Sequence, residues 1–474
     1  MSKRLVTSFA AVGLLLGGCS LAPRYERPAS PVADSYTTSA STSATDKAVA
    51  DISWEEFFSD PRLQTVIRTA LENNRDLRVA ALNVERVRAL YNIQRTALIP
   101  SLDATADGSR RRTPGDLSAS GQSTISSSYQ VGLEIPSYEL DFFGRVTSLR
   151  DQVLQQYLAT EEAQRSAQIS LISTIARQYF AVLATEEQLA LARQTLDAAN
   201  RSFELNRKSY EAGVASELDL RTAETQRESV RASVAAIEQS RDLAKNALAL
   251  LVGAPLPNDV LTTGSLATQN LIDDLPAGLP SDLLTRRPDI LAAEHILQAA
   301  NANIGIARAA FFPSVKLTAF GGSASPELSG LFASGSKAWS FAPSVTLPIF
   351  AAGRNKAQLN VANIQKRIEI ANYEKAIQTA FREVSDALAV RQSIGTQIDA
   401  QTARTAAAQR RYELSEQRYK AGVDSFLSVL LAQQELFSAQ QQLVTARLAR
   451  LDNLTTLYAA LGGGVPRAES REQK

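Results

Sequence analysis

The feature of this sequence that most constrains its fold is a duplicated helical pattern. The stretch Phe203–Leu218 returns with identical spacing as Tyr412–Leu427, and both copies contain Tyr-x-Ala-Gly-Val at the same place. A Pro-Ser pair and a Gly-Arg pair recur ahead of each copy. Internal repetition at this scale indicates two structural units of the same kind. Each half is therefore predicted to contain a helix, two strands, a very long helix, a turn and a returning helix.

Helix-breaking residues are scarce in both halves. No proline occurs between residues 136 and 255 or between residues 348 and 466. This predicts helices of ~65 residues, about 100 Å long at 1.5 Å per residue. Gly213 and Gly422 follow long helical stretches, where a glycine ends a helix through a left-handed residue. Apolar residues recur every seven positions, as in a coiled-coil seam: Ile175, Val182, Leu189, Leu196, Phe203 and Tyr210, and more weakly Ile377, Val384, Ile398, Tyr412 and Tyr419. We expect two antiparallel coiled-coil hairpins.

Four short segments outside the hairpins alternate apolar and polar residues: Ser101–Arg111, Tyr129–Ile135, Val315–Ala319 and Trp339–Leu347. Such segments are typical of an outer-membrane β-barrel, although a half-buried sheet in a soluble domain shows the same alternation. The polar, Gly- and Ser-rich connectors at about 112–124 and 321–337 are predicted to be surface loops. Four strands cannot close a barrel, and lipid does not tolerate an open edge. Two chains would give eight strands with a filled interior, and three would give twelve strands and room for a pore.

The N-terminus carries a compartment signal. Lys3 and Arg4 precede an apolar stretch too short to span a bilayer, which indicates a signal peptide. The following Leu-Gly-Gly-Cys19 resembles the bacterial lipobox, so Cys19 is predicted to become the lipidated N-terminus. The alternative is an ordinary signal peptide with a coincidental cysteine. Residues 20 to about 50, rich in Ser, Thr, Ala and Pro, are interpreted as an extended tether.

Composition argues against several classes of function. Lys and Arg total 50 against 49 Asp and Glu, so no basic surface points to nucleic acid. A single histidine and a single cysteine leave almost nothing for a His/Cys metal or catalytic site. We expect neither an enzyme nor a bound cofactor, apart from covalent diacylglycerol and N-acyl lipid on Cys19. The lone His295 is interpreted as structural.

Several motifs together resemble the TolC-like outer membrane factors, most closely the OprM-type lipoproteins of multidrug efflux. They are the lipobox at Cys19, Trp54-x-x-Phe-Phe, Asn74-Arg-Asp-Leu, Ala97-Leu-Ile-Pro-Ser, Glu139-Leu-Asp-x-Phe-Gly-Arg, both Tyr-x-Ala-Gly-Val turns, Arg286-Arg-Pro-Asp and Leu461-Gly-Gly-Gly. The resemblance implies an α+β membrane protein: a trimeric, twelve-stranded outer-membrane barrel, a long periplasmic helical barrel and a mixed equatorial belt. It also implies a homotrimer in outer-membrane lipid, a periplasmic adaptor and an inner-membrane pump of the resistance-nodulation-division type.

The resemblance and the repeat together divide the chain. The expected segments are the signal peptide (1–18), the lipidated tether (19–50), an equatorial and first helical segment (51–100), the first β-hairpin (101–138), the first long helical hairpin (139–254), an equatorial segment (255–287), a helix of the second repeat (288–312), the second β-hairpin (313–349), the second long helical hairpin (350–463) and a polar tail (464–474).

The resemblance further implies a gate at the periplasmic tip. Tyr419 and Asp219 match a tyrosine–aspartate latch between neighbouring hairpins, and a phenol donating to a carboxylate is a charge-assisted bond. Asp424 belongs to the same latch but stands where some relatives carry arginine. The simpler interpretation of Asp219 is a carboxylate that favours the start of a helix.

The same comparison places a constriction in the last helix. Leu427 matches a constricting leucine, whereas Ser428 and Leu431 stand where relatives carry aspartate rings that select cations. We therefore expect an apolar constriction and weaker block by cations. Ordinary coiled-coil packing is the alternative for both leucines. The turn residues are expected to dock the adaptor: Gly213, Val214, Gly422 and Val423.

The predicted function is an outer-membrane channel that passively conducts drugs, solvents or other small toxic molecules out of a Gram-negative cell. Two alternatives remain at this point. One is a channel for one-step protein secretion, because the family fold serves both roles. The other is a lipid-anchored periplasmic coiled-coil scaffold, against which the four alternating strands argue.

Overall fold

The structure is a computed structural model that describes residues 20–36, 49–255, 264–273, 275 and 280–464. The chain divides into two compact units. The first comprises Met1–Ala29, Asn83–Glu161 and Ala292–Glu374, and the second comprises Ser30–Leu82, Glu162–Leu291 and Lys375–Lys474. Each unit combines residues from both halves of the duplication.

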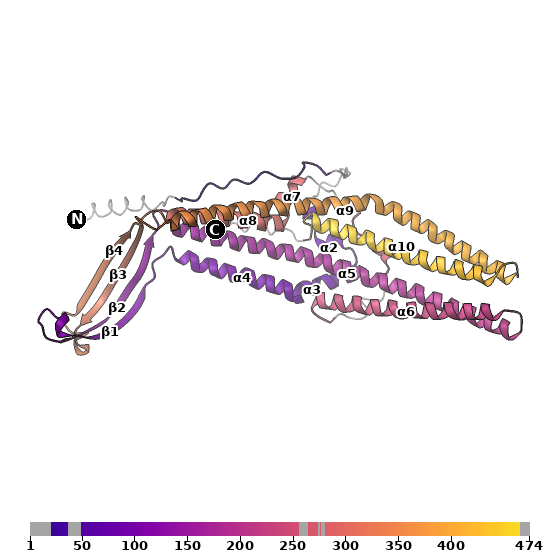
Figure 1. Cartoon of the computed structure of the whole chain (residues 1–474), viewed down its shortest axis with the longest axis horizontal. Helices are drawn as coiled ribbons and strands as arrows, with labels where there is room; N and C mark the ends of the chain where they lie inside the picture. Colours follow the sequence, from indigo (N-terminus) through magenta and orange to yellow (C-terminus); the bar gives the residue numbers. More distant parts are fainter. Residues whose placement is uncertain (1–19, 37–48, 256–263, 274, 276–279, 465–474) are drawn as a thin grey trace. The chain divides into compact units, whose positions relative to one another are not determined.

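Long helices dominate both units (Figure 1). In chain order they are α2 (Trp54–Phe57), α3 (Pro61–Asn73), α4 (Arg75–Thr96), α5 (Arg145–Glu211), α6 (Glu217–Val252), α7 (Pro280–Arg286), α8 (Pro288–Ala309), α9 (Arg354–Lys420) and α10 (Phe426–Ala460). α5 and α9 each have 67 residues, so the length expected from the scarcity of breakers is confirmed. Among the residues described, no helix is both long and apolar enough to cross a bilayer.

The first unit contains a four-stranded antiparallel sheet in the order β1-β2-β3-β4 (Figure 1). Its strands are β1 (Asp103–Thr113), β2 (Thr124–Leu140), β3 (Ser314–Ser325) and β4 (Lys337–Thr346). β1 pairs only with β2, and β4 only with β3, so within the described chain both outer edges lack a partner strand. Large apolar side chains of the sheet are exposed: Ile125, Leu133, Trp339, Phe341 and Val345.

β2 and β3 are longer than the sequence predicted. The expected loop from Gly321 onward is wrong for its first five residues, 321–325, which continue β3 opposite β2. Gly322 pairs with Gly132, and a Cβ on Gly322 would lie only 2.1 Å from the carbonyl oxygen of Val131. The two backbones approach closely because side chains are missing there, so these glycines belong to strand pairing and not to a loop.

The N-terminal segment of the first unit, expected as an extended tether, is bound along α8 at residues 21–27. The guanidinium of Arg27 donates from Nε and Nη2 to the carboxylate of Glu294, at 2.8 and 2.9 Å. The hydroxyl of Tyr25 donates to the same carboxylate at 3.0 Å. Further along α8, the amide of Asn301 donates to the carbonyl of Pro23 at 2.7 Å. Glu294 is buried, and these donors compensate its lost hydration.

An aromatic cluster organises the second unit. The rings of Phe57 and Tyr458 stack with centroids 4.0 Å apart, and Phe58 meets Tyr458 edge-on at 6.2 Å. The hydroxyl of Tyr458 donates to the carbonyl of Ile52 at 2.6 Å, and burial raises the pKa of Tyr458. The cluster joins α2 to the end of α10. This contact gives a structural reason for the Trp-x-x-Phe-Phe motif.

Candidate functional site

The first hairpin of the second unit turns at Gly213, between α5 and α6. Gly213 has a φ of +75°, and its N–H donates to the carbonyl of Tyr210 at 2.9 Å. The N–H of Val214 donates to the carbonyl of Ser209 at 2.8 Å. This pair of bonds is the Schellman motif, which satisfies the last carbonyls of a helix.

The second hairpin repeats this turn between α9 and α10. Gly422 has a φ of +71°, and its N–H donates to the carbonyl of Tyr419 at 2.9 Å. The N–H of Val423 donates to the carbonyl of Arg418 at 3.0 Å. The duplicated Ala-Gly-Val sequence therefore encodes the same backbone turn twice.

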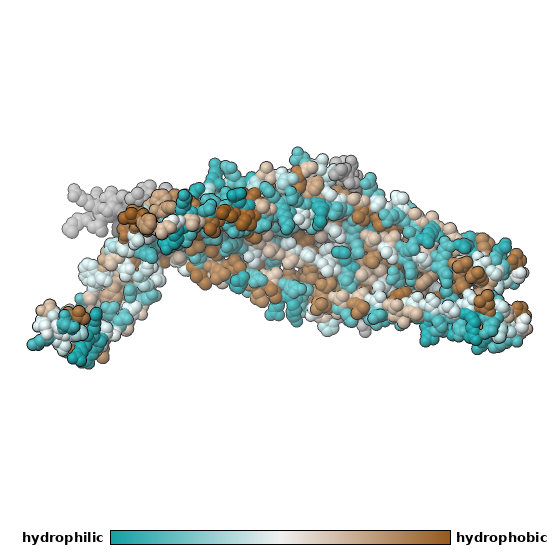
Figure 2. Space-filling view, viewed as in Figure 1, coloured by the Kyte–Doolittle hydropathy of each residue, from teal (hydrophilic) through white to brown (hydrophobic). Residues whose placement is uncertain are grey.

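Both turns present apolar surface. The valine after each glycine is exposed, Val214 at 83% and Val423 at 65%. Leu218, in the first turn of α6, is 75% exposed. Figure 2 shows such apolar side chains at the ends of the hairpins among polar neighbours. The expected docking role of the turns remains a prediction, and the exposure of the valines is consistent with it.

At the start of each returning helix a carboxylate accepts a backbone hydrogen bond. In α6, Asp219 and Ser216 form a reciprocal capping box: the backbone N–H of Asp219 donates to Ser216 Oγ, and Ser216 N–H donates to the carboxylate, both at 3.2 Å. In α10, Asp424 accepts from Ser428 Oγ and from the N–H of Ser425, both at 2.8 Å. These bonds, and a further one from Arg418, lower the pKa of Asp424. Both aspartates therefore accept hydrogen bonds at a helix start within their own protomer.

A small core lies behind the two turns. Its buried members are Ala223, Phe426 and Val429, with Phe203, Tyr412 and Tyr419 packed against them. The core draws on all four helices of the two hairpins. The rings of Tyr419 and Phe426 are 5.7 Å apart, and the guanidinium of Arg227 lies 4.0 Å above the ring of Phe203. A cation in this position is attracted by the ring quadrupole. The tips of the two hairpins are thus packed together within one protomer.

The hydroxyl of Tyr419 finds an unexpected partner. It donates to Asn206 Oδ1 at 3.5 Å, and Asn206 Nδ2 donates to the carbonyl of Ser202 at 3.0 Å. Burial and the nearby charge of Asp219 raise the pKa of Tyr419. Asp219 thus acts on Tyr419 through its charge, while the hydrogen bond goes to Asn206. The predicted latch between neighbouring hairpins remains a prediction.

Sequence reasoning missed Asn206, although a signal was present. Asn206 is fully buried and lies three residues after Phe203, at the second core position of the heptad. A lone asparagine in a coiled-coil core lowers stability but fixes register and partner choice. The hydrogen bond between Asn206 and Tyr419 joins α5 to α9 at the tip.

The predicted constriction residues fall on one exposed side of α10. Leu427 is 55% exposed and Leu431 is 48% exposed, whereas Val429 and Leu430 between them are both 7% exposed. Val429 and Leu430 pack within the protomer, whereas the side chains of Leu427 and Leu431 stay exposed. A pore-lining role needs this exposure, and the constriction remains a prediction. Cys19, the predicted lipidation site, lies outside the described residues.

Comparison with known proteins decides the family. Residues 66–254 and 279–463 match the family model described as outer membrane efflux protein. The chain belongs to this family. Outer membrane efflux proteins closely similar to it include the toluene efflux pump outer membrane protein TtgC of Pseudomonas putida. TtgC is 48% identical over 467 residues, which cover 98% of this chain and 96% of TtgC. The antibiotic efflux pump outer membrane protein ArpC, also from Pseudomonas putida, matches with the same identity and coverage.

A solved outer membrane channel shares the fold. The MtrE outer membrane channel of Neisseria gonorrhoeae in its open state aligns with a TM-score of 0.86 at 44% identity, covering 94% of this chain and 98% of that one. The fold class expected from the TolC-like resemblance is confirmed. The predicted role in efflux across the outer membrane is also confirmed, and the protein-secretion alternative loses its support.

Proposed function

We propose that three copies of this chain form an efflux channel that receives small toxic molecules from an inner-membrane pump through a periplasmic adaptor. In this proposal Cys19 carries the acyl chains that anchor each copy in the outer membrane, and the hairpin tips dock the adaptor. Transport is passive conduction through a gate at the tips, where Tyr419, Asp219 and Asp424 hold neighbouring hairpins and Leu427 narrows the pore.

The observation that carries the proposal is the sheet with two open edges. The outward-facing backbone N–H and C=O groups of β1 and β4 find no partner strand within the described chain. In a bilayer each such group costs several kcal/mol, so β1 must pair with β4 of a neighbouring copy. Three copies then supply twelve strands, enough to leave a central passage.

The substrate follows from relatives only as a class. One similar protein is named for toluene and another for antibiotics, at the same identity to this chain. Both names point to small apolar or amphipathic molecules as the substrate class. The apolar residues on the exposed side of α10 suit such cargo better than a strongly charged ring would.

The first test is conductance of the purified protein in planar lipid bilayers. The wild type is compared with Tyr419→Phe combined with Asp219→Ala, and with Tyr210→Phe as a control. Tyr210 occupies the equivalent position in the first repeat and is 41% exposed. We expect small, stable wild-type channels, several-fold larger conductance in the double variant and no change in the control.

Each other outcome is informative. Equal conductance in the wild type and the double variant refutes the latch and leaves the channel intact. A folded oligomer that conducts in no variant refutes the channel and favours the scaffold. In cells, the protein should restore solvent or antibiotic tolerance to a strain that lacks its own channel. A Cys19→Ser variant exported with a cleavable signal peptide should no longer incorporate lipid label in the membrane fraction.

A further inference from the structure

Arg287 marks the junction between α7 and α8 in the second unit. Its N–H donates to the carbonyl of Leu283 at 3.0 Å, and its own carbonyl accepts from the N–H of Leu291 at 3.1 Å. The backbone of this one residue therefore closes α7 and opens α8. Its side chain is only 9% exposed.

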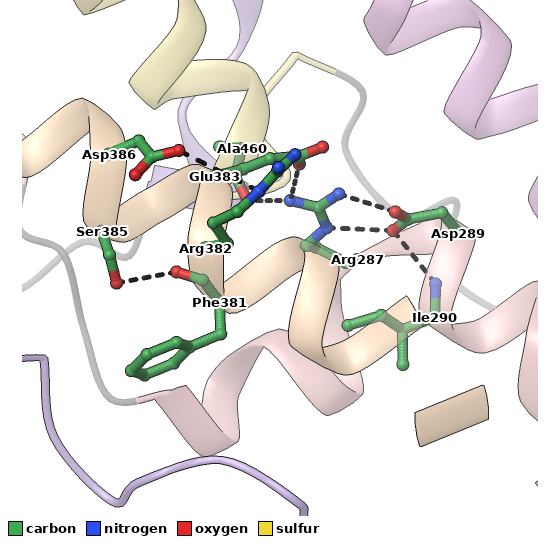
Figure 3. A network of polar contacts seen from close by, with 9 residues as sticks. All are labelled: Arg287, Asp289, Ile290, Phe381, Arg382, Glu383, Ser385, Asp386 and Ala460. Atoms are coloured by element: carbon green, nitrogen blue, oxygen red, sulfur yellow. Dashed lines mark hydrogen bonds and ion pairs between the residues drawn. The ribbon is translucent and has the colours of Figure 1, made fainter. Parts of the chain in front are cut away.

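The guanidinium of Arg287 connects three helices (Figure 3). Nε and Nη2 donate to the two carboxylate oxygens of Asp289 in the first turn of α8, at 3.0 and 2.6 Å. Nη1 donates to Glu383 of α9 and to the carbonyl of Ala460, the last residue of α10, both at 2.9 Å. Only the fork of an arginine can serve a bidentate carboxylate and two further acceptors at once.

These bonds lie at the base of the α9–α10 hairpin, opposite its turn. Ala460 ends α10, whereas Gly422 lies at the far end of the same hairpin. Beside the bonds is a cavity of about 440 Å³, bordered by Arg287, Glu383, Ala460 and hydroxyl residues of α5. On the side of this cavity the bonds of Arg287 hold the base of the hairpin, in addition to the packing of Tyr458 on Phe57.

The length of the hairpin amplifies any movement at its base. Gln417 follows Glu383 by 34 residues along α9, which is about 50 Å at 1.5 Å per residue. A rotation of roughly 5° at the base then moves Gln417 by ~4 Å. Gln392, only nine residues from Glu383, moves by ~1 Å.

We infer that Arg287 is a positioning residue for channel opening: it clamps the base of the α9–α10 hairpin to α8, so that the tip opens by rotation about a fixed base. This inference rests on the proposed function. It assigns a role to the Arg-Arg-Pro-Asp motif, which the gate at the tip does not explain. Weakening the clamp releases the tip although no residue of the tip is changed.

The test measures distances between equivalent spin labels in the assembled full-length protein. The chain has one cysteine, Cys19, so a cysteine placed at exposed Gln417 reports the tip and one at exposed Gln392 reports the base. The unmutated parent gives the background from Cys19. Each label is combined with Arg287→Lys, which keeps the charge and loses the fork. Glu383→Gln, which weakens only the α9 contact, is a second variant in case the first does not fold.

The matched control is Arg382→Lys. Arg382 precedes Glu383 on α9, but its side chain is 72% exposed and it lies 4.0 Å from Asp386 on the same helix (Figure 3). We expect both clamp variants to lengthen and broaden the Gln417 distances by about 4–8 Å, with changes below about 2 Å at Gln392. The control should match the wild type at both positions.

Three results would overturn the inference. They are an unchanged Gln417 distribution in both folded clamp variants, the same broadening in Arg382→Lys, and equal shifts at Gln417 and Gln392. If the wild type itself shows no distances between copies, the proposed trimer is wrong, and the clamp inference is rejected with it.

Discussion

Replacing glycine with alanine is predicted to have opposite effects on stability at Gly422, in the turn after α9, and at Gly395, inside α9. Gly422 has a φ of +71°, and a Cβ there would meet no atom within 4 Å. The cost of Gly422→Ala is therefore backbone strain alone, about 1–2 kcal/mol for an L-residue in the left-handed region. Gly395 lies inside α9, is exposed and also has open space around its Cβ position. Gly395→Ala should stabilise the helix by about 1 kcal/mol.

Amide hydrogen exchange on the purified protein measures both effects locally. Under conditions where exchange reports the opening equilibrium, Gly422→Ala should speed exchange of the turn amides by about 5- to 30-fold, because 1.4 kcal/mol is a factor of ten. Gly395→Ala should slow exchange around residue 395 by about fivefold. Slower or unchanged exchange at the Gly422 turn would show that the left-handed conformation is not required there. An equal effect of the two substitutions would refute the argument from backbone conformation altogether.

Three further predictions concern other parts of the molecule. Gly305→Ala places a Cβ 2.9 Å from Ala22, so it should detach the N-terminal segment from α8, seen as faster proteolysis near residue 25. Leu431→Asp should create a ring of carboxylates in the assembled channel and make its conductance several-fold more sensitive to divalent cations. Hydrogen bonds lower the pKa of Asp424, so its stabilisation of the turn should be present above about pH 4 and be lost as the pH falls through the lowered pKa. Amide exchange in the turn should therefore speed up as the pH falls, and Asp424→Asn should abolish this increase.

The long helices and their turns were predictable because their causes are local. Missing prolines set the lengths of α5 and α9, and a glycine after each helix sets the turn. The capping role of Asp219 could also be read from the sequence as a carboxylate at a helix start. Each of these features depends on residues within a few positions of one another.

The contacts that could not be predicted join residues far apart in sequence. Tyr25 and Arg27 meet Glu294 across more than 260 positions, whereas composition alone predicts only an extended tether there. The sequence predicts a loop at Gly322 because its partner Gly132 lies in the other repeat. Asn206 was overlooked because its partner Tyr419 lies on the other hairpin. A single sequence holds no record of such pairings.

The two open edges of the sheet also bear on the order of events during biogenesis. A lone protomer in a bilayer would expose roughly half of the backbone polar groups of β1 and of β4 to lipid, at a cost of order tens of kcal/mol. No single chain can therefore rest in the membrane as a stable intermediate. Insertion and association must occur as one concerted step, and its rate should rise more than linearly with the concentration of chains at the membrane surface.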